Sequence, residues 1–329
     1  MELQALQTAG SEWRPVSALT IDMASRFSLL APRYWPTAFG LALLRVLEPL
    51  PYRLLIALGS ALGTVVRWLP LSFVRIARRN LELCLPELDG AARERLLRAH
   101  FRSLGISVFE TAIAWWSSDA RIHRLTRVEG LEHLRHALQA GHGAILLSAH
   151  FTTLEIGARA LAAVHPISIM YRPTKNALLG RFLAHNRARL TRGAIPRDDI
   201  RTLVATLGAN EAVWYAPDQS FRKKGAQMVP FFGIPAATNT ATSRLAKMTG
   251  AAVLPYFPER LPGARGYRMH ILEPLREFPS GDRVADATRL NALIETHIRK
   301  VPEQYLWIHR RFKGLGPDYP RYYAPVGDG

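Results

Sequence analysis

The sequence predicts an α/β protein in which a mainly parallel or mixed sheet is covered by helices, preceded by an α-helical region. Short apolar runs bounded by glycine or polar residues recur between positions 143 and 272 and predict buried strands. Segments of helical spacing separate these runs, which is the pattern of a helix-covered, mainly parallel sheet. Before residue 137 the apolar spacing is mostly helical.

Four parts of the chain are expected. Residues 1–33 form a poorly defined segment, and residues 34–136 form a helical, membrane-interface region packed on the core. Residues 137–313 form the α/β core. The Pro- and Gly-rich residues 314–329 form a loosely ordered tail.

The first helical region has the composition of a membrane-surface element. Residues 34–74 are rich in Leu, Ala and Trp and carry only isolated charges, and their longest uncharged run, 54–66, is too short to cross a bilayer. We therefore expect one or two helices that lie in a membrane interface, with Trp35 and Trp68 as anchors. A pair of helices packed in the protein core is the alternative.

In the core, strands and helices are expected to alternate. Strands are expected at 143–149, 167–170, 211–216, 252–257 and 267–272, and helices at 153–164, 178–190, 199–207, 240–249 and 285–300. In such a fold, chemistry is expected beyond the carboxyl ends of the strands.

Charge and cysteine content limit the class of partner and the compartment. The chain has 43 Lys and Arg against 26 Asp and Glu, a net charge of +17, which predicts a polyanionic partner: nucleic acid, anionic lipid, a phosphorylated substrate or an acidic protein. The single cysteine, Cys84, excludes an internal disulfide or multi-cysteine metal site and indicates a reducing compartment. Residues 1–20 lack the pattern of a secretory signal, so we expect the body of the protein in the cytoplasm.

The corner after the first core strand, SAHFTTLE, contains His150 and Glu155. Two residues five apart on one helix point about 140° apart, so they can cooperate only if His150 precedes the helix and Glu155 lies inside it. The carboxylate can then hold one ring nitrogen while the other accepts a substrate proton. A helix-capping histidine beside a solvated acid is the alternative. No GxSxG elbow and no cluster of three metal ligands is present, which favours direct transfer to a substrate hydroxyl without a metal.

Six ordered sequence blocks resemble the lipid A late acyltransferases, the lauroyl- and myristoyltransferases of Gram-negative bacteria. SAHFTTLE is followed by YRP, NRAR, WYAPDQSFRKKG, PFFGIPAAT and PEQYLWIHRRFK, and the resemblance extends over residues 34–313, including LPYRLLIALGSALG and RRNLELCLPEL. The His-x4-acid motif of the wider glycerolipid acyltransferases falls on His150 and Glu155, with Glu where Asp is usual.

The resemblance implies a glycerolipid-acyltransferase-like fold and an enzyme on the cytoplasmic face of the inner membrane. Such an enzyme moves a fatty acyl chain, lauroyl before myristoyl, from acyl carrier protein to a hydroxyl of a primary hydroxyacyl chain of Kdo2-lipid IVA, a phosphorylated lipid A precursor. It implies no cofactor besides the acyl donor. The +17 charge suits the acidic carrier, the phosphorylated acceptor and anionic inner-membrane lipids.

The resemblance also implies roles for particular residues. His150 would deprotonate the acceptor hydroxyl and Glu155 would orient it. Arg187 is the first candidate to stabilise the oxyanion, and the backbone amides of the His150 corner are the alternative donors. Arg187 could instead bind a phosphate or be a solvated charge on its helix. Asp218 would position Arg187 or a polar group of the substrate, against a turn after Pro217 as the alternative. Candidate contacts to phosphate, headgroup or carrier are Arg172, Arg189, Gln219, Arg222, Lys223, Lys224, Arg310 and Arg311.

Other functions are open at this point. A glycerolipid or lysophospholipid acyltransferase would use the same His/acid apparatus on another acceptor. A basic nucleic-acid-binding protein would explain the charge, but not the apolar N-terminal region or the lack of a recognisable binding module, so nucleic acid is not an expected partner. A membrane-surface scaffold without catalysis is the third alternative.

Overall fold

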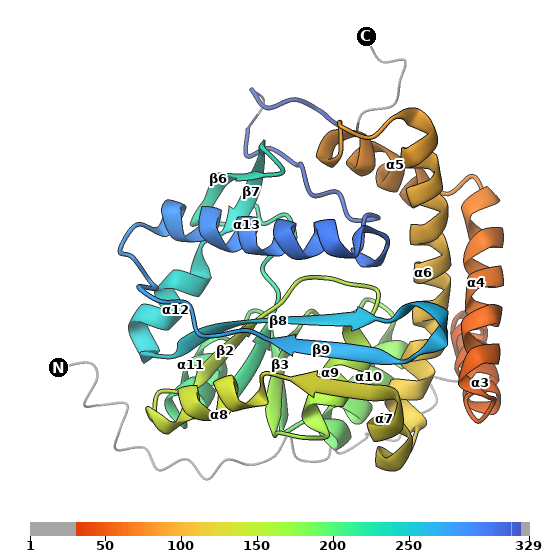
Figure 1. The fold of residues 1–329 in the computed structure, drawn as a ribbon, viewed down its shortest axis with the longest axis horizontal. Coiled ribbons are helices and arrows are strands. Elements are labelled where there is room, and N and C mark those ends of the chain that lie inside the picture. Colours follow the sequence, from red (N-terminus) through yellow and green to blue (C-terminus); the bar gives the residue numbers. More distant parts are fainter. Residues whose placement is uncertain (1–30, 317, 324–329) are drawn as a thin grey trace.

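The computed structural model describes residues 31–316 and 318–323, and its centre is a seven-stranded sheet with the strand order β1-β9-β8-β2-β5-β3-β4 (Figure 1). Its strands are β1 (Thr126–Glu129), β2 (Ala144–Leu147), β3 (Ile167–Tyr171), β4 (Gly193–Pro196), β5 (Ala212–Tyr215), β8 (Ala252–Arg260) and β9 (Tyr267–Ile271). Only β8 and β9 pair antiparallel; the other neighbours are parallel. A separate antiparallel hairpin joins β6 (Ala226–Phe231) to β7 (Ile234–Asn239). The fold class predicted from the sequence, α/β with a mostly parallel, helix-covered sheet, is confirmed.

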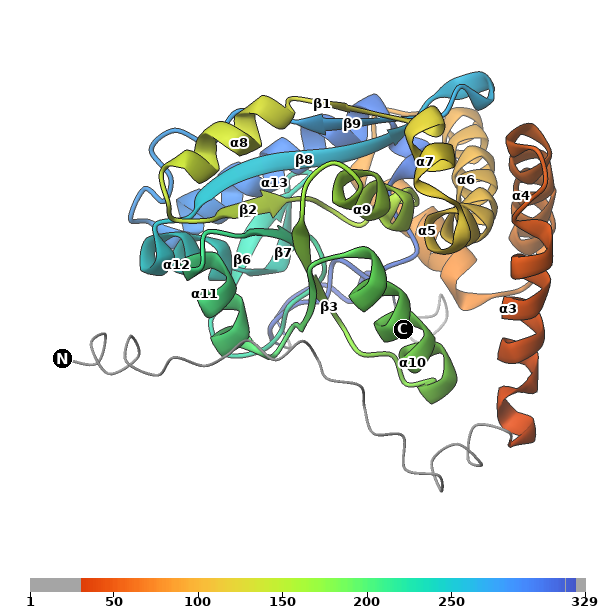
Figure 2. The same cartoon turned by 90° about the horizontal axis from the view of Figure 1, so that it is seen from below.

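Helices bury both faces of this sheet, which explains why its central strands are apolar without alternation. All four residues of β2 are buried. Leu146 packs in a cluster with residues of α6 (Gly90–Trp116) and α9 (Leu154–Ala162) on one face. Ile145 packs on the other face with residues of α11 (Ile200–Gly208) and α12 (Ala241–Thr249). Figure 2 shows the sheet between these two sets of helices.

The remaining described helices precede, connect or follow the strands along the chain. They are α3 (Trp35–Leu47), α4 (Tyr52–Trp68), α5 (Ser72–Cys84), α7 (Asp119–Leu125), α8 (Leu131–Gln139), α10 (Ala177–Leu190) and α13 (Arg283–Lys300), with short 3-10 turns at Pro32–Tyr34, Pro262–Ala264 and Pro302–Gln304. Side-chain caps define several helix starts: Asp89 accepts a hydrogen bond from the backbone amide of Ala92 at the start of α6, and Asn176 caps α10 by accepting from that of Leu179.

Helix α4 contacts α6 at backbone distance because glycines line the contact. A Cβ atom added at Gly63 would overlap the carbonyl oxygen of Phe101, and one added at Gly105 would overlap that of Gly59. The buried face of α4 is therefore narrow, and its other face remains exposed.

Helices α3 and α4 lie along one edge of the molecule, outside α6 (Figures 1 and 2). Within the described part of the chain, no helix is long and apolar enough by itself to cross a bilayer. Helices α4 and α5 meet those criteria only when they are counted together, and they are bent by 93°.

Most expected core elements appear in the structure, and their bounds differ from the predicted ones by a few residues at the ends of the elements. The sequence patterns did not reveal strands β1 and β4 or the β6–β7 hairpin. The expected segment 1–33 lies outside the described residues except for 31–33, and the expected tail 314–329 lies outside them at 317 and 324–329.

Candidate active site

The polar residues of the site lie at the carboxyl edge of the sheet. His150 is in the corner between β2 and α9, and Asp218 follows β5. Strands β2 and β5 are parallel neighbours, so their carboxyl ends bring these two corners together. This is the edge at which the sequence predicted chemistry.

The acid that holds His150 is Asp218. The Nδ1 atom of His150 lies 2.6 Å from Oδ1 of Asp218, and the backbone amide of His150 donates to Oδ2 at 3.0 Å. The Asp218 side chain is 1% exposed, whereas that of His150 is 25% exposed. The imidazole is thus fixed from the protein side and open on its other side.

The charges of this pair are set by burial and by each other. Burial acts to lower the pKa of His150, but the charge and hydrogen bond of Asp218 outweigh it and raise that pKa above its ordinary 6.5. Burial acts to raise the pKa of Asp218, but His150 lowers it to about 2. Asp218 is therefore ionised near neutral pH and only accepts hydrogen bonds, so Nδ1 carries the proton. In neutral His150 the Nε2 lone pair is then available to accept a proton, because Nε2 bonds to none of the described residues.

The C-terminal segment completes the support of the pair. The Tyr305 hydroxyl donates to Oδ2 of Asp218 at 3.1 Å, and the backbone amide of Leu306 donates to the carbonyl of His150 at 2.9 Å. On the other side of Asp218, the backbone amide of Ser220 donates to Nε2 of His309 at 3.1 Å. Burial lowers the pKa of His309 to about 4, so this ring is neutral and can accept.

The backbone amides of the His150 corner are already used. The amide of His150 binds Asp218, that of Phe151 donates to the carbonyl of Ala149, and that of Thr152 donates to the carbonyl of Gln304 at 2.7 Å. These three amides cannot serve a tetrahedral oxyanion, and the rival to Arg187 is lost at these positions.

Glu155 does not hold the imidazole, and the expectation that it orients His150 differs from the structure. Its carboxylate accepts from Nη2 of Arg187 at 2.8 Å and from Nε1 of Trp115 at 3.1 Å. The Arg187 guanidinium also lies 5.3 Å from the centre of the Tyr171 ring. Glu155 starts α9, where it faces α10 and α6, while the parallel pairing of β2 and β5 gives His150 a different acid.

Arg187 is held firmly and is still partly accessible. Its side chain is 14% exposed and that of Glu155 is 22% exposed. Asp218, which we expected to position Arg187 or a substrate group, is instead fully engaged by His150 and Tyr305.

The other predicted contact residues fall into two groups. Arg189 and Arg311 make structural bonds: Arg189 donates to the carbonyl of Trp115, and the buried Arg311 donates to the carbonyl of Ala237 and the hydroxyl of Thr238, each at 2.8 Å. Buried Arg311 therefore links the C-terminal segment to β7 and is closed to a ligand, contrary to expectation. The remainder lie at or near the surface: Arg172, Gln219, Arg222, Lys223 (bonded to Asp198), Lys224 and Arg310.

Several supporting residues were missed from the sequence. Tyr305 and His309 lie in the block PEQYLWIHRRFK, whose sequence does not reveal that they contact Asp218 and its loop. Arg260 forms a buried bidentate ion pair with Glu110 of α6 and donates to Ser103, whose hydroxyl bonds Thr152 at 2.7 Å. This network ties α6 and β8 to the His150 corner. Over the described residues, no group of three or more His, Cys, Asp or Glu side chains is placed to hold a metal ion.

The fold and site define a class of protein before any comparison is made. A helix-covered sheet presents a carboxylate-bound histidine at its carboxyl edge, and Nε2 of this histidine is free among the described residues to accept a proton.

Comparison with known proteins gives the family. Residues 23–314 match the family of bacterial lipid A biosynthesis acyltransferases, and the chain belongs to this family; it is an acyltransferase. The chain is 39% identical over 285 residues to the lipid A biosynthesis palmitoleoyltransferase of Escherichia coli, covering 86% of this chain and 93% of the relative. It is 37% identical over 297 residues to the lipid A biosynthesis lauroyltransferase of the same organism, covering 90% and 97%. It is 25% identical over 288 residues to the lipid A biosynthesis myristoyltransferase, covering 87% and 89%.

Proposed function

We propose that this enzyme transfers a fatty acyl chain from acyl carrier protein to a hydroxyl of a primary hydroxyacyl chain of the lipid A precursor Kdo2-lipid IVA. The single observation that carries the mechanism is the His150–Asp218 pair, with Nδ1 bonded at 2.6 Å and Nε2 open. Family membership supports the lipid A precursor as the acceptor.

In the proposed reaction, Nε2 of His150 takes the proton of the acceptor hydroxyl while its oxygen attacks the thioester carbonyl of the donor. Asp218 stabilises the imidazolium that forms. The tetrahedral intermediate collapses as the carbon–sulfur bond breaks, and the departing thiolate of the carrier takes the proton back from His150. The products are the new ester and the free carrier thiol, so the enzyme returns to its initial state.

We assign the stabilisation of the oxyanion to Arg187. Glu155 fixes one amino group of the guanidinium at 2.8 Å, which limits the orientations of the rest. The backbone amides of His150, Phe151 and Thr152 already form hydrogen bonds. Arg187 of α10 is therefore the first candidate to donate to the oxyanion. In this account Glu155 positions Arg187, and Asp218 orients His150 and stabilises its charged form.

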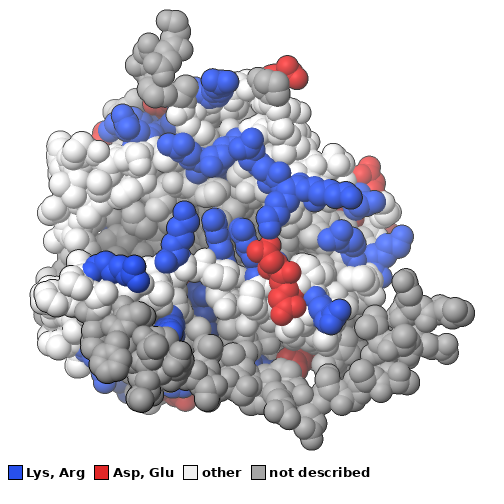
Figure 3. Space-filling model, turned by 180° about the vertical axis from the view of Figure 1, so that it is seen from behind, with Lys and Arg blue, Asp and Glu red and all other residues white. Residues whose placement is uncertain are grey.

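The surface supports a donor and an acceptor that are both anionic. Figure 3 shows that Lys and Arg side chains cover much more of one face than Asp and Glu do. A net charge of +17 favours encounter with an acidic carrier protein and with anionic lipids.

We further propose that the enzyme rests on the cytoplasmic face of the inner membrane through α3 and α4. Both helices expose apolar residues at the same spacing of four, four and three positions, which places them on one helix face; α4 also exposes Trp68 at its end. These two apolar stripes are Trp35, Phe39, Leu43 and Val46 on α3, and Leu54, Leu58, Leu62 and Val65 on α4. An acceptor that stays in the bilayer requires an enzyme that reaches the interface.

For the acyl chain we propose lauroyl as the first donor to test. The identities to the palmitoleoyl- and lauroyltransferase relatives, 39% and 37%, exceed the 25% identity to the myristoyltransferase relative. Mass spectrometry of lipid A from cells that lack the protein should show the loss of one acyl group, and the missing mass gives its length.

The acceptor is tested by competition. Purified enzyme with labelled lauroyl-acyl carrier protein should acylate the lipid A precursor and leave a lysophospholipid and glycerol phosphate unlabelled. Preferential labelling of either of the latter would assign the protein to glycerolipid synthesis instead.

A further inference from the structure

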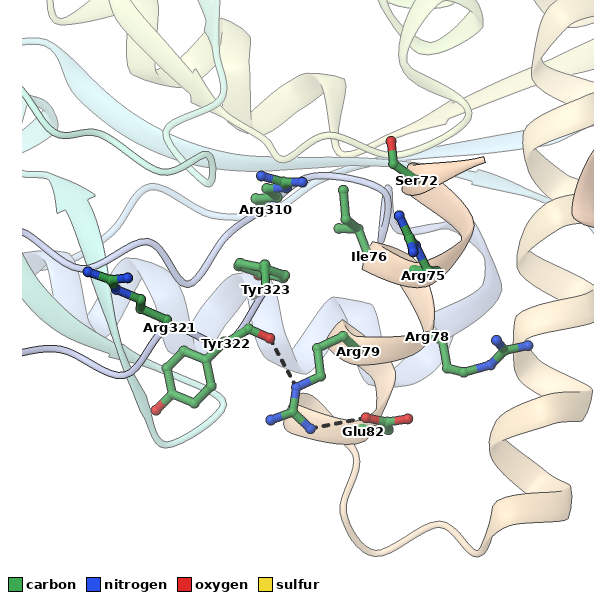
Figure 4. A pocket seen from close by; sticks show the side chains of 10 residues that line it. All are labelled: Ser72, Arg75, Ile76, Arg78, Arg79, Glu82, Arg310, Arg321, Tyr322 and Tyr323. Atoms are coloured by element: carbon green, nitrogen blue, oxygen red, sulfur yellow. Dashed lines mark hydrogen bonds and ion pairs between the residues drawn. The ribbon is translucent and has the colours of Figure 1, made fainter. Parts of the chain in front are cut away.

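A groove lined with arginines lies beside the active site and takes no part in the mechanism above. Helix α5 forms one wall, and Arg310 and residues 321–323 form the other (Figure 4). The groove has a volume of about 880 Å³, within the range of sites that hold a small molecule or headgroup, roughly 300–1,000 Å³.

The positive charge of the groove is largely uncompensated. Among the residues that the structure places, five arginines and one acidic residue, Glu82, line it; the arginines are Arg75, Arg78, Arg79, Arg310 and Arg321. Arg79 forms an ion pair with Glu82 at 3.1 Å. Arg78 points away from the groove (Figure 4) and forms an ion pair with Glu94 of α6. Arg75, Arg310 and Arg321 form no ion pair with any residue within 31–316 or 318–323. Three exposed arginines therefore line one concavity without an ion-pair partner among the described residues, which favours a ligand with several negative charges.

The groove also offers apolar surface beside its charges. Tyr322, Tyr323 and Ile76 line it together with the arginines. Aromatic rings beside arginines suit a ligand that carries both sugar rings and anionic groups, since the rings pack against the apolar faces of a sugar while guanidinium groups bind phosphate.

The walls of the groove are fixed to each other by buried polar groups. The Asn80 side chain of α5 donates to the carbonyl oxygens of Trp307 and His309, at 2.5 and 2.8 Å. The Tyr323 hydroxyl donates to Oδ1 of Asn80 at 2.6 Å and accepts from the amide of Phe312. These bonds hold the groove open in one shape before a ligand arrives, which reduces the ordering cost of binding.

The chain connects the groove to α4 at one end and to the support of Asp218 at the other. Helix α4 ends at Trp68, and both Trp68 and Leu69 are exposed. Helix α5 begins three residues after Leu69, at Ser72, and Ser72 lines the groove. At the other end, Arg310 directly follows His309, which supports the loop of Asp218. The groove is therefore linked through the chain both to the end of α4 and to the loop of Asp218.

We propose that this arginine groove binds the phosphorylated sugar headgroup of the glycolipid acceptor and so sets which acceptor is presented to His150. This inference rests on the proposed function, because it takes the acceptor from there. It commits to the acceptor headgroup rather than to acyl carrier protein, because the site is concave and of headgroup size, whereas a protein partner is bound over a larger, flatter surface.

The test is equilibrium binding of the lipid A precursor, in detergent micelles and without acyl donor, to the full-length enzyme. The groove variant carries Arg75→Gln, Arg310→Gln and Arg321→Gln. Its matched control removes the same charge at exposed arginines of α7, β1 and α8, with Arg124→Gln, Arg127→Gln and Arg135→Gln. We expect the groove variant to bind at least 10-fold more weakly than the wild type and the control to remain within twofold. The wild type should bind the dephosphorylated precursor as weakly as the groove variant binds the intact one.

Three outcomes would overturn the proposal. Equal binding by the groove variant and the control would show that the arginines are solvated charges. A loss of affinity for acyl carrier protein, with precursor binding intact, would assign the groove to the donor. An equal loss of binding to phosphatidylglycerol vesicles would reduce it to general attraction for anionic lipid. Acyl transfer by the wild type is measured in parallel, so that failure of the groove assignment is distinguished from failure of the proposed reaction.

Discussion

At the scale of single residues, the partner of His150 is set by strand pairing and not by nearness in the chain. Glu155 is five residues from His150 yet bonds Arg187, whereas Asp218 is 68 residues away and bonds Nδ1. The sequence located His150 by its motif and placed Asp218 at the correct strand end. It could not pair them, because that requires knowing that β2 and β5 are neighbours.

The pH dependence of acyl transfer tests this pairing. In the proposed mechanism transfer needs neutral His150, and Asp218 raises the pKa of His150 above 6.5. The rate at limiting substrate should therefore fall as the pH drops through a midpoint above 6.5. In Asp218→Asn the carboxylate is gone and burial, which lowers the pKa of His150, is unopposed, so the midpoint should move below 6.5. The Asn oxygen should keep the bonds from Tyr305 and from the amide of His150, which turns its NH2 group toward Nδ1. The ring would then carry its proton on Nε2, so the plateau rate should fall about 10³-fold or more. An unchanged midpoint in the variant would contradict the pairing.

Arg187 should act on the reaction more than on binding. Replacing it with Met should lower kcat by about 10²–10³-fold, the typical effect of losing one oxyanion donor, with KM for the acceptor within a few-fold. Glu155→Gln should give a smaller loss of kcat, because Arg187 remains but is held less firmly. Arg181→Met, at another arginine of α10, is the control. A rise in KM alone for Arg187→Met would assign this arginine to binding a phosphate.

At the scale of elements, strong apolar runs were predictable and weak ones were not. Strand β2 is buried at every residue, and its continuous apolar run predicted it. Strand β1 alternates between half-buried and exposed residues over only four positions, and β4 is as short, because both lie at the edges of the sheet. Such short strands are specified by their neighbours more than by their own sequence.

The α4–α6 contact makes a prediction about stability. Gly63→Ala would push a methyl group into the Phe101 carbonyl, so we expect destabilisation of about 1–3 kcal/mol, the usual range for overpacking. Gly40→Ala, in α3, meets no atom within 4 Å and should be neutral or stabilise by about 0.5–1 kcal/mol through helix propensity. Thermal unfolding of both variants decides this, and similar melting temperatures would argue against a close contact between the two helices.

At the scale of the whole molecule, function depends on surfaces assembled from distant segments. The arginine groove brings α5 together with Arg310 and residues 321–323, more than 200 positions later, so no local sequence pattern predicts it. The apolar composition of residues 34–74 predicted helices with apolar surfaces. Which of their side chains are exposed depends on how α4 packs on α6, which the composition does not reveal.

The stripes predict how the enzyme binds vesicles. Phe39→Asp with Val65→Asp places charges on both stripes, at side chains that are 71% and 61% exposed. We expect at least a 10-fold lower partition onto vesicles that contain anionic lipid, because the apolar surface that would enter the interface is interrupted. Met248→Asp with Val284→Asp makes the same change at exposed residues of α12 and α13. If the two double variants lost partition equally, net charge and not the stripes would govern membrane binding.

The most direct test of the central claim is the rate of acyl transfer by His150→Ala, measured with lauroyl-acyl carrier protein and the lipid A precursor. We predict a fall in kcat of about 10²–10⁴-fold, the contribution of a general base, with membrane recovery and melting temperature close to wild type. His185→Ala, at an exposed histidine of α10, should retain full turnover. Turnover by His150→Ala comparable to the wild type would contradict the assignment of His150 as the base.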